Sequence, residues 1–216
     1  MSNKPLEKSV RYSSTNTYET LNELTDITKN VWIVFHGIGY LSKYFLKYFD
    51  ELNPEDNYII APQAPSKYYL NNSYKHVGAS WLTKENTETE IINNLNYLDA
   101  ILEEETILSN RNLIIFGYSQ GVSMAARWVA QRKIVCNQLV LYAGGIPNEL
   151  NATDFTHLGN NTQITIIIGN KDEYLTKERL SIEREKSRTI FNGKAKEHIF
   201  DGGHIVKKEL INSLII

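Results

Sequence analysis

The sequence predicts an α/β fold, a doubly wound and mostly parallel sheet without a separate cap domain. Three observations indicate it. Short apolar runs rich in β-branched residues recur along the chain, most of them lack the alternation of a half-exposed strand, and helical patterns separate them. Such runs form the central strands of a parallel sheet covered on both faces. The runs occupy residues 31–35, 58–60, 113–116, 139–142 and 164–168.

The first eighty residues contribute the least regular patterns. Apolar and polar residues alternate weakly in residues 9–22, which is compatible with an antiparallel hairpin at one edge of the sheet with a turn at residues 14–16. A short helical pattern follows the first buried run, at residues 41–52. Residues 61–83 form a long irregular stretch with prolines and aromatic side chains. Its length favours a functional loop over a simple connection, and core packing of the aromatic residues is the alternative.

Residues 87–105 give the strongest helical pattern. Thr87 and Glu90 have the spacing of a capping box, which predicts the start of the helix. The three glutamates at residues 103–105 would place negative charge at the negative end of the helix dipole, which predicts fraying or an early end. The apolar residues recur at spacings of four, three and four: Ile91, Leu95, Leu98 and Leu102.

The second half of the chain alternates helices with the remaining runs. Residues 120–131 carry an apolar stripe, and basic residues gather towards the C-terminal end, as the helix dipole favours. Shorter helical patterns lie at residues 175–190 and 205–214. Between them, residues 197–200 are less apolar than the other runs and suit a strand nearer the edge of the sheet.

Length and charge limit the possible classes of protein. A chain of 216 residues with 42% hydrophobic content suffices for one sizeable core, so we expect residues 1–216 to form a single domain. The 23 basic and 25 acidic residues give a net charge of -2, which offers no electrostatic footprint for nucleic acid or an anionic membrane. We therefore expect a small or neutral molecule as partner. The oligomeric state, including a homodimer, stays open.

Cysteine usage and hydropathy suggest a compartment. Cys136 is the only cysteine, so no internal disulfide can form. Residues 1–20 are polar and contain no apolar signal-peptide region, and no apolar run approaches the length that spans a membrane. These features predict a cytoplasmic protein that does not insert into the membrane.

The pentapeptide GYSQG at residues 117–121 is the most informative motif. It follows an apolar run and opens a helical pattern. Where a buried strand turns sharply into a helix, flanking glycines remove side chains that would clash, and the central residue stands exposed at the end of the sheet. The five letters alone fit an ordinary strand-to-helix turn equally well. In this context they predict that Ser119 is a nucleophile.

A serine hydroxyl needs a base and a third group that orients the base. His204 follows the last predicted strand in a glycine-rich loop, and Asp172 follows the run that ends at residue 168. Both therefore lie at carboxyl ends of strands, as Ser119 does. Considered alone, His204 is better explained as a solvated loop histidine than as a catalytic base. The order of serine, acid and histidine along the chain favours the triad instead. Asp154 and Asp201 are the rival acids.

Two backbone N–H groups are candidates for binding an oxyanion. Gln120 directly follows the nucleophile, and Ile38 lies in the glycine-containing loop after the first buried run. In that loop His36 has the position of a residue that holds the loop by hydrogen bonds. Tyr40 beside the oxyanion loop and Trp81 in the irregular stretch are candidates for binding substrate. The chemistry requires neither a metal nor an organic cofactor.

These residues resemble the α/β-hydrolase superfamily, and within it the small carboxylesterases that include the acyl-protein thioesterase and phospholipase/carboxylesterase-like group. The resemblance implies the α/β-hydrolase fold, a triad of Ser119, Asp172 and His204, and oxyanion donors at Ile38 and Gln120. The matching segments are FHGIG at 35–39, APQAP at 61–65, SWL at 80–82, SNR at 109–111, GYSQG at 117–121, GNKD at 169–172 and GGH at 202–204.

Two positions depart from the family pattern. Val122 stands where members usually carry another glycine, and Glu173 replaces the proline that commonly follows the acid. Neither touches the chemistry directly, but both weaken a transfer of protein-depalmitoylating specificity, and residues 1–30 have no counterpart. We expect a serine esterase that cleaves carboxylic esters or thioesters through an acyl-enzyme. The alternatives are a catalytically silent binding module and acyl transfer to an acceptor other than water.

Overall fold

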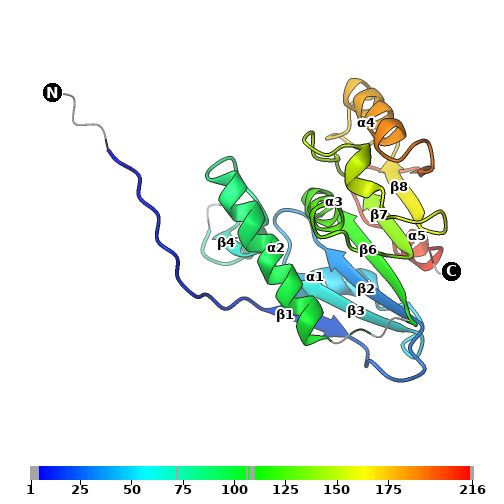
Figure 1. Cartoon of the computed structure of the whole chain (residues 1–216), viewed down its shortest axis with the longest axis horizontal. Helices are drawn as coiled ribbons and strands as arrows, with labels where there is room; N and C mark the ends of the chain where they lie inside the picture. The colour runs from blue at the N-terminus through cyan, green and yellow to red at the C-terminus, as the bar shows by residue number, and fades with distance from the viewer. Residues whose placement is uncertain (1–4, 72, 106, 108–109, 215–216) are drawn as a thin grey trace.

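The computed structural model describes residues 5–71, 73–105, 107 and 110–214. Within these residues seven strands form one mixed sheet in the order β1-β3-β2-β6-β7-β8-β9, in which β1 is antiparallel and every other pairing is parallel (Figure 1). Ser109 of the sequence motif at 109–111 lies outside the described residues. The strands are β1 (Tyr18–Leu21), β2 (Asn30–Phe35), β3 (Asn57–Pro62), β6 (Asn112–Tyr118), β7 (Gln138–Tyr142), β8 (Gln163–Gly169) and β9 (Lys196–Phe200).

The predicted parallel strands are confirmed, and burial explains their composition. Every residue of β2, β3 and β7 is buried, so these strands need apolar side chains on both faces. In β9, which closes the sheet, only Phe200 is buried. The prediction of an edge strand from the low apolar content of residues 197–200 is therefore confirmed.

Helices cover both faces of the sheet, as a doubly wound fold requires (Figure 1). Alternate residues of β2 pack in opposite directions: Ile33 belongs to the core under α2, α3 and α4, and Trp32 to the core under α1, η1 and α5. The helices are α1 (Ser42–Phe45), η1 (Leu46–Tyr48), α2 (Thr87–Glu104), α3 (Gln120–Arg132), η2 (Ala152–Phe155), α4 (Lys177–Ile190) and α5 (Lys208–Asn212).

The antiparallel edge is a single strand, so the expected hairpin at residues 9–22 is wrong. β1 pairs with β3, with Tyr18 opposite Pro62 and Leu21 opposite Ile59. Residues 5–15 are exposed and run away from the sheet without regular structure (Figure 1). This polar segment buries too little apolar surface to offset the entropy cost of ordering a second strand.

The start of α2 also differs from the prediction. Asn86, in a left-handed conformation with φ of 48°, is the N-cap, and its side chain makes no capping hydrogen bond. Thr87 is the first helical residue, and its hydroxyl donates to the carbonyl of Thr83 at 2.7 Å. The capping box is therefore wrong, because a local turn engages the threonine hydroxyl. The helix ends at Glu104, inside the run of glutamates.

The irregular stretch at residues 61–83 contains regular structure that the pattern did not indicate. β4 (Ser66–Tyr69) and β5 (Val77–Ser80) form an antiparallel pair outside the main sheet. The backbone of Ala79 exchanges hydrogen bonds with residues 39 and 40, at 2.8 and 3.2 Å. The pair is thereby fixed against the loop that follows β2. Because β4 is fully exposed, its sequence needs no apolar alternation.

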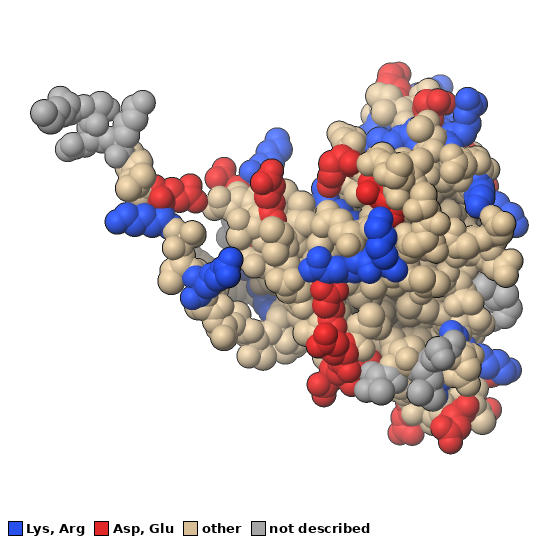
Figure 2. Space-filling model, viewed as in Figure 1, with Lys and Arg blue, Asp and Glu red and all other residues tan. Residues whose placement is uncertain are grey.

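Figure 2 shows the charged side chains on one face of the molecule. Acidic and basic groups are interspersed there, and several acidic groups adjoin one another in a short run near the lower centre of the view. In the part of the chain that the structure describes, no helix combines the length and the apolar character that a bilayer crossing requires.

Candidate active site

Ser119 occupies a strained turn between β6 and α3. Its backbone has φ of 54° and ψ of −118°, which is unfavourable for a residue with a side chain. A hydrogen bond of 2.9 Å from its N–H to the carbonyl of Tyr142 helps to hold this conformation. A Cβ atom at Gly121 would lie 2.1 Å from the carbonyl oxygen of Phe35, so glycine is required for α3 to approach β2. The sequence motif thus forms the sharp turn that it predicts.

Ser119, His204 and Asp172 form a continuous chain of hydrogen bonds. The hydroxyl Oγ of Ser119 lies 2.8 Å from Nε2 of His204, and Nδ1 of His204 lies 2.8 Å from Oδ2 of Asp172. The Asp172 side chain is completely buried, and its other oxygen accepts the backbone N–H of Tyr174 at 2.9 Å. Because a carboxylate can only accept at Nδ1, the neutral imidazole in this geometry presents Nε2 to the serine hydroxyl as a hydrogen-bond acceptor.

The loops that carry the acid and the histidine are held together by their backbones. The N–H of Lys171 donates to the carbonyl of Gly202 at 2.9 Å, and the N–H of Gly202 donates to the side chain of Asn170 at 3.2 Å. A Cβ atom at Gly169 would approach the carbonyl oxygen of Gly202 to 2.4 Å. Glycine at the end of β8 therefore permits the close contact that brings residues 172 and 204 together.

Neither rival acid contacts His204. Asp154 accepts the backbone N–H of Asn151 at 2.9 Å and completes a capping box at the start of η2. Asp201 pairs with Lys171 at 2.7 Å, and this ion pair lowers the pKa of the Asp201 carboxyl. Each carboxylate thus has a local structural partner, and only Asp172 is placed to orient the imidazole.

Two backbone N–H groups beside Ser119 are available to a ligand. Among the described residues, no protein acceptor receives a hydrogen bond from the N–H of Ile38 or of Gln120. Gln120 is the first residue of α3, where the N–H has no partner within the helix and the helix dipole is positive. The loop before Ile38 lies against Ser119, since a Cβ atom at Gly37 would be 3.1 Å from Cβ of Ser119. Ile38, Ser119 and Gln120 also line one and the same cavity.

His36 holds the loop that carries Ile38. The imidazole is fully buried; Nδ1 lies 2.8 Å from the carbonyl oxygen of Gly37, and Nε2 accepts the backbone N–H of Ala64 at 3.1 Å. A single neutral tautomer satisfies both contacts. Burial lowers the pKa of His36 to about 4, so the residue stays neutral near pH 7. Its role is to position the loop.

This burial predicts a loss of stability in acid. The pKa of His36 is 6.5 in the unfolded chain and about 4 in the folded chain. The free energy of unfolding therefore keeps its full value above pH 6.5 and decreases as the pH falls from 6.5 towards 4. The contribution amounts to about 3 kcal/mol. We expect urea denaturation of His36→Asn to show a smaller decrease in the free energy of unfolding between pH 7 and pH 4 than the native protein. His76→Asn, at an exposed position, serves as the control; equal decreases in native protein and His36→Asn would contradict the assignment.

A cavity of about 380 Å³ opens above Ser119. We call it the Ser119 cavity. Five residues singled out in the sequence contribute to its wall, namely Ile38, Tyr40, Ser119, Gln120 and His204. The other lining residues are Tyr118, Ser123, Ala143, Gly144, Gly145, Tyr174, Leu175 and Arg179.

Trp81 does not line the Ser119 cavity. Its side chain is completely buried, its indole N–H donates to the carbonyl of His36 at 2.8 Å, and its ring packs against Phe35. The suggestion that Trp81 binds substrate therefore finds no support in its position. The alternative reading of the aromatic residues, core packing, describes this tryptophan. Trp81 therefore helps to hold the loop after β2 through its hydrogen bond to His36.

Several residues of the site carried no signal in the sequence. The Tyr118 hydroxyl donates to the backbone carbonyl of His204 at 2.9 Å, and burial raises the pKa of Tyr118, which keeps this donor protonated. The ring of Tyr174 packs edge-on against His204 with ring centres 4.8 Å apart. The side chain of Gln120, a residue singled out in the sequence only for its backbone N–H, accepts the N–H of Trp81 at 2.8 Å and so ties the turn at Ser119 to the residue after β5. Only the position of Tyr118 and Gln120 inside the motif could have indicated them.

Comparison with known proteins identifies the family. Residues 16–215 match the model of the phospholipase/carboxylesterase family. The chain belongs to this family. Its members are hydrolases of the esterase type, and the mixed sheet flanked by helices is the α/β-hydrolase fold. No curated protein sequence matches the chain.

Solved structures share the fold of this family member at low sequence identity. Acyl-protein thioesterase 2 of Zea mays has 12% identity and a TM-score of 0.68, with 93% of this chain and 96% of that chain covered. Esterase PE8 has 17% identity and a TM-score of 0.66, with coverage of 92% and 96%. A phospholipase/carboxylesterase from Dyadobacter fermentans has 18% identity and a TM-score of 0.64, with coverage of 94% and 98%. At these identities the similarity establishes the fold alone.

Proposed function

We propose that the protein is a serine hydrolase that cleaves carboxylic esters or thioesters of a small or acyl substrate through a covalent acyl-enzyme. One observation carries the proposal: the hydrogen-bond chain from Ser119 through His204 to the buried Asp172 ends beside two unengaged N–H groups in an open cavity. Membership of the phospholipase/carboxylesterase family supports the same reaction class.

The geometry suggests the order of steps. The Ser119 hydroxyl proton passes to Nε2 of His204 as Oγ attacks the carbonyl carbon of the substrate. The N–H groups of Ile38 and Gln120 stabilise the oxyanion, each contributing about 3 kcal/mol to lowering the barrier. Asp172 stabilises the imidazolium that forms. This ion then protonates the departing oxygen or sulfur, and the carbonyl reforms as an ester of Ser119.

Deacylation reverses these roles. Water gives a proton to Nε2 of His204 and attacks the acyl carbonyl, and the same two N–H groups stabilise the second oxyanion. His204 then returns the proton to Oγ of Ser119, and the carboxylic acid leaves. Nε2 of His204 accepts and donates every proton that is transferred in the two steps, so the proposed reaction needs no cofactor.

A fluorophosphonate probe tests the proposal. Oγ of an activated serine displaces fluoride from phosphorus, so we expect the mass of one adduct on the native protein, located at Ser119 by peptide mapping. Hydrolysis of p-nitrophenyl butyrate should stop as the adduct forms. Absence of both labelling and hydrolysis in folded protein would favour the catalytically silent binding module. Product analysis with added alcohols identifies acyl transfer to acceptors other than water.

A further inference from the structure

Arg179 brings a positive charge to the wall of the Ser119 cavity. It lies in the first turn of α4, where the helix dipole is also positive. An arginine guanidinium does not lose its proton in proteins. Of the described residues that line the cavity, Arg179 is therefore the one that carries a permanent charge.

Contacts on two sides fix the place of the Arg179 guanidinium. Its Nη1 donates to the carbonyl of Tyr174 at 3.0 Å, and a Cβ atom at Gly145 would lie 3.2 Å from its Nη2. The preceding residue, Gly144, lies against Ser119, since a Cβ atom there would be 2.3 Å from the backbone oxygen of Ser119. Because adjacent Cα atoms are about 3.8 Å apart, Nη2 lies within about 12 Å of that oxygen.

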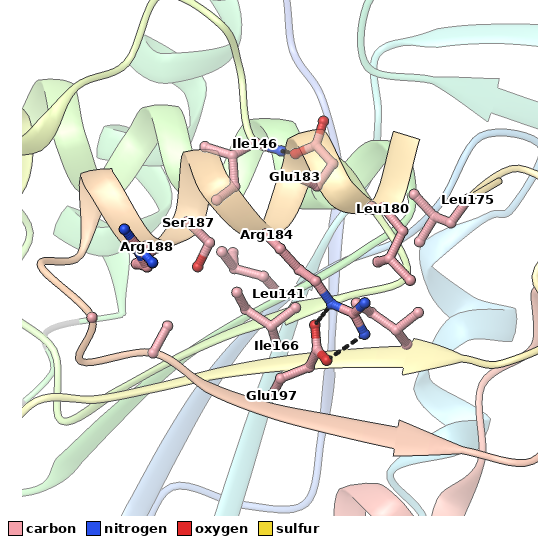
Figure 3. Close-up of a pocket in the computed structure, with 14 residues that line it drawn as sticks. Leu141, Ile146, Ile166, Leu175, Leu180, Glu183, Arg184, Ser187, Arg188 and Glu197 are labelled. Carbon is pink, nitrogen blue, oxygen red and sulfur yellow. Dashed lines mark hydrogen bonds and ion pairs between the residues drawn. The ribbon is translucent and has the colours of Figure 1, made fainter. Parts of the chain in front are cut away.

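The other two arginines of α4 are paired with carboxylates. Arg184 donates two hydrogen bonds, of 2.7 and 2.6 Å, to Glu197 across the cavity of about 290 Å³ beneath the helix (Figure 3). Arg188 lies 3.8 Å from Glu185. Arg179 differs from both, since no carboxylate in the described part of the chain forms an ion pair with it.

Glu183 is the acidic residue beside Arg179, and its charge is already compensated. Its Oε1 would lie 2.9 Å from the same Cβ atom at Gly145, but this oxygen accepts a hydrogen bond of 3.0 Å from Nζ of Lys186. Its Oε2 accepts the backbone N–H of Ile146 at 3.0 Å (Figure 3). The guanidinium therefore keeps an unpaired charge and free N–H groups, which is the arrangement that binds a carboxylate through two hydrogen bonds.

Arg179 lies on the side of the cavity that belongs to His204. Its hydrogen-bond partner, Tyr174, packs its ring edge-on against the imidazole of His204, with ring centres 4.8 Å apart. In the proposed reaction Nε2 of His204 protonates the departing oxygen or sulfur. The alcohol or thiol part of the substrate must therefore lie on this side of Ser119.

We propose that Arg179 binds a carboxylate on the leaving group of the substrate. This inference rests on the proposed function and adds a substrate class, esters or thioesters whose alcohol or thiol carries a negative charge. The fixed guanidinium would hold the leaving group beside the nitrogen atom that protonates it. The acyl group needs no charge for this contact.

Two thioesters measure the contact on the native protein. The butyryl thioesters of β-mercaptopropionate and of β-mercaptopropionamide have the same acyl group, and their leaving groups differ by a carboxylate against a neutral amide. Hydrogen bonds to a charged group are the stronger ones, so kcat/KM for the carboxylate should exceed that for the amide about tenfold. A ratio at or below about one would overturn the inference. Absence of turnover of the neutral amide thioester would instead count against the proposed function.

Removal of the guanidinium makes the test specific. Arg179→Gln should lower the ratio of kcat/KM for the carboxylate to that for the amide to about one. Lys177→Gln removes the same charge at the exposed first position of α4, outside the cavity lining, and should keep the native ratio. A native ratio in Arg179→Gln, or an equal loss in both variants, would contradict a direct contact.

A second pair of substrates checks the side on which the carboxylate binds. The esters p-nitrophenyl hydrogen adipate and p-nitrophenyl adipamate make the same exchange of carboxylate for amide on the acyl group. We expect native protein to show a smaller ratio for this pair than for the thioesters, because the acyl group lies away from His204. A preference for the carboxylate in this pair alone would overturn the assignment to the leaving group.

Discussion

Ser119→Ala is expected to lower kcat for p-nitrophenyl butyrate about 10⁴-fold or more and to abolish labelling by a fluorophosphonate. The methyl group cannot attack the carbonyl carbon, so the covalent route is lost. The N–H groups of Ile38 and Gln120 remain, and they can still accelerate attack by water on a bound ester. A small residual rate above the uncatalysed reaction is therefore consistent with the proposal.

Ser123→Ala is the matched control for this result. Ser123 lies one turn further along α3 and also lines the Ser119 cavity, but its hydroxyl accepts a hydrogen bond from Arg127 at 3.0 Å and does not contact His204. We expect its kcat to stay within about tenfold of the native value. If Ser119→Ala kept its labelling, or if both variants lost activity equally, the nucleophile would have been assigned wrongly.

Asp172→Asn is expected to lower kcat about 10⁴-fold with little change in the fold. The buried carboxylate accepts the N–H at Nδ1 of His204, which leaves Nε2 free to accept the serine proton. An amide nitrogen in its place favours the opposite tautomer, with the proton on Nε2 facing Ser119. In that tautomer His204 cannot act as the base. Steady-state kinetics measures the loss, and circular dichroism with thermal melting checks the fold.

Asp201→Asn controls for the loss of a carboxylate near the histidine loop. Asp201 is exposed and pairs with Lys171 rather than with His204. Exposed ion pairs contribute little to stability, so we expect near-native kcat and melting temperature. The assignment of the acid would be reversed if Asp201→Asn lost activity and Asp172→Asn kept it.

Much of the fold could be predicted from the sequence, because the governing physics is local. A strand buried on both faces must be apolar throughout, and this requirement makes β2 and β7 visible as short continuous runs. The edge strand β9 is visible by contrast, since only Phe200 is buried there. Two errors of the sequence-based prediction have local causes, the capping box at Thr87 and the missed strand β4. The hydroxyl of Thr87 bonds within its own turn, and the exposed β4 has no pattern to detect.

The sequence by itself singled out Ser119, Asp172 and His204, because each residue type has a chemical role and each follows a strand of the predicted sheet. Only the tertiary structure decided their distances, the buried position of Trp81, and the cavity beneath α4. The physical reason is that chemical identity and periodicity are properties of the chain. Packing between α4 and β8, and hydrogen bonds between residues 171 and 202, depend on segments that meet only when the sheet is assembled.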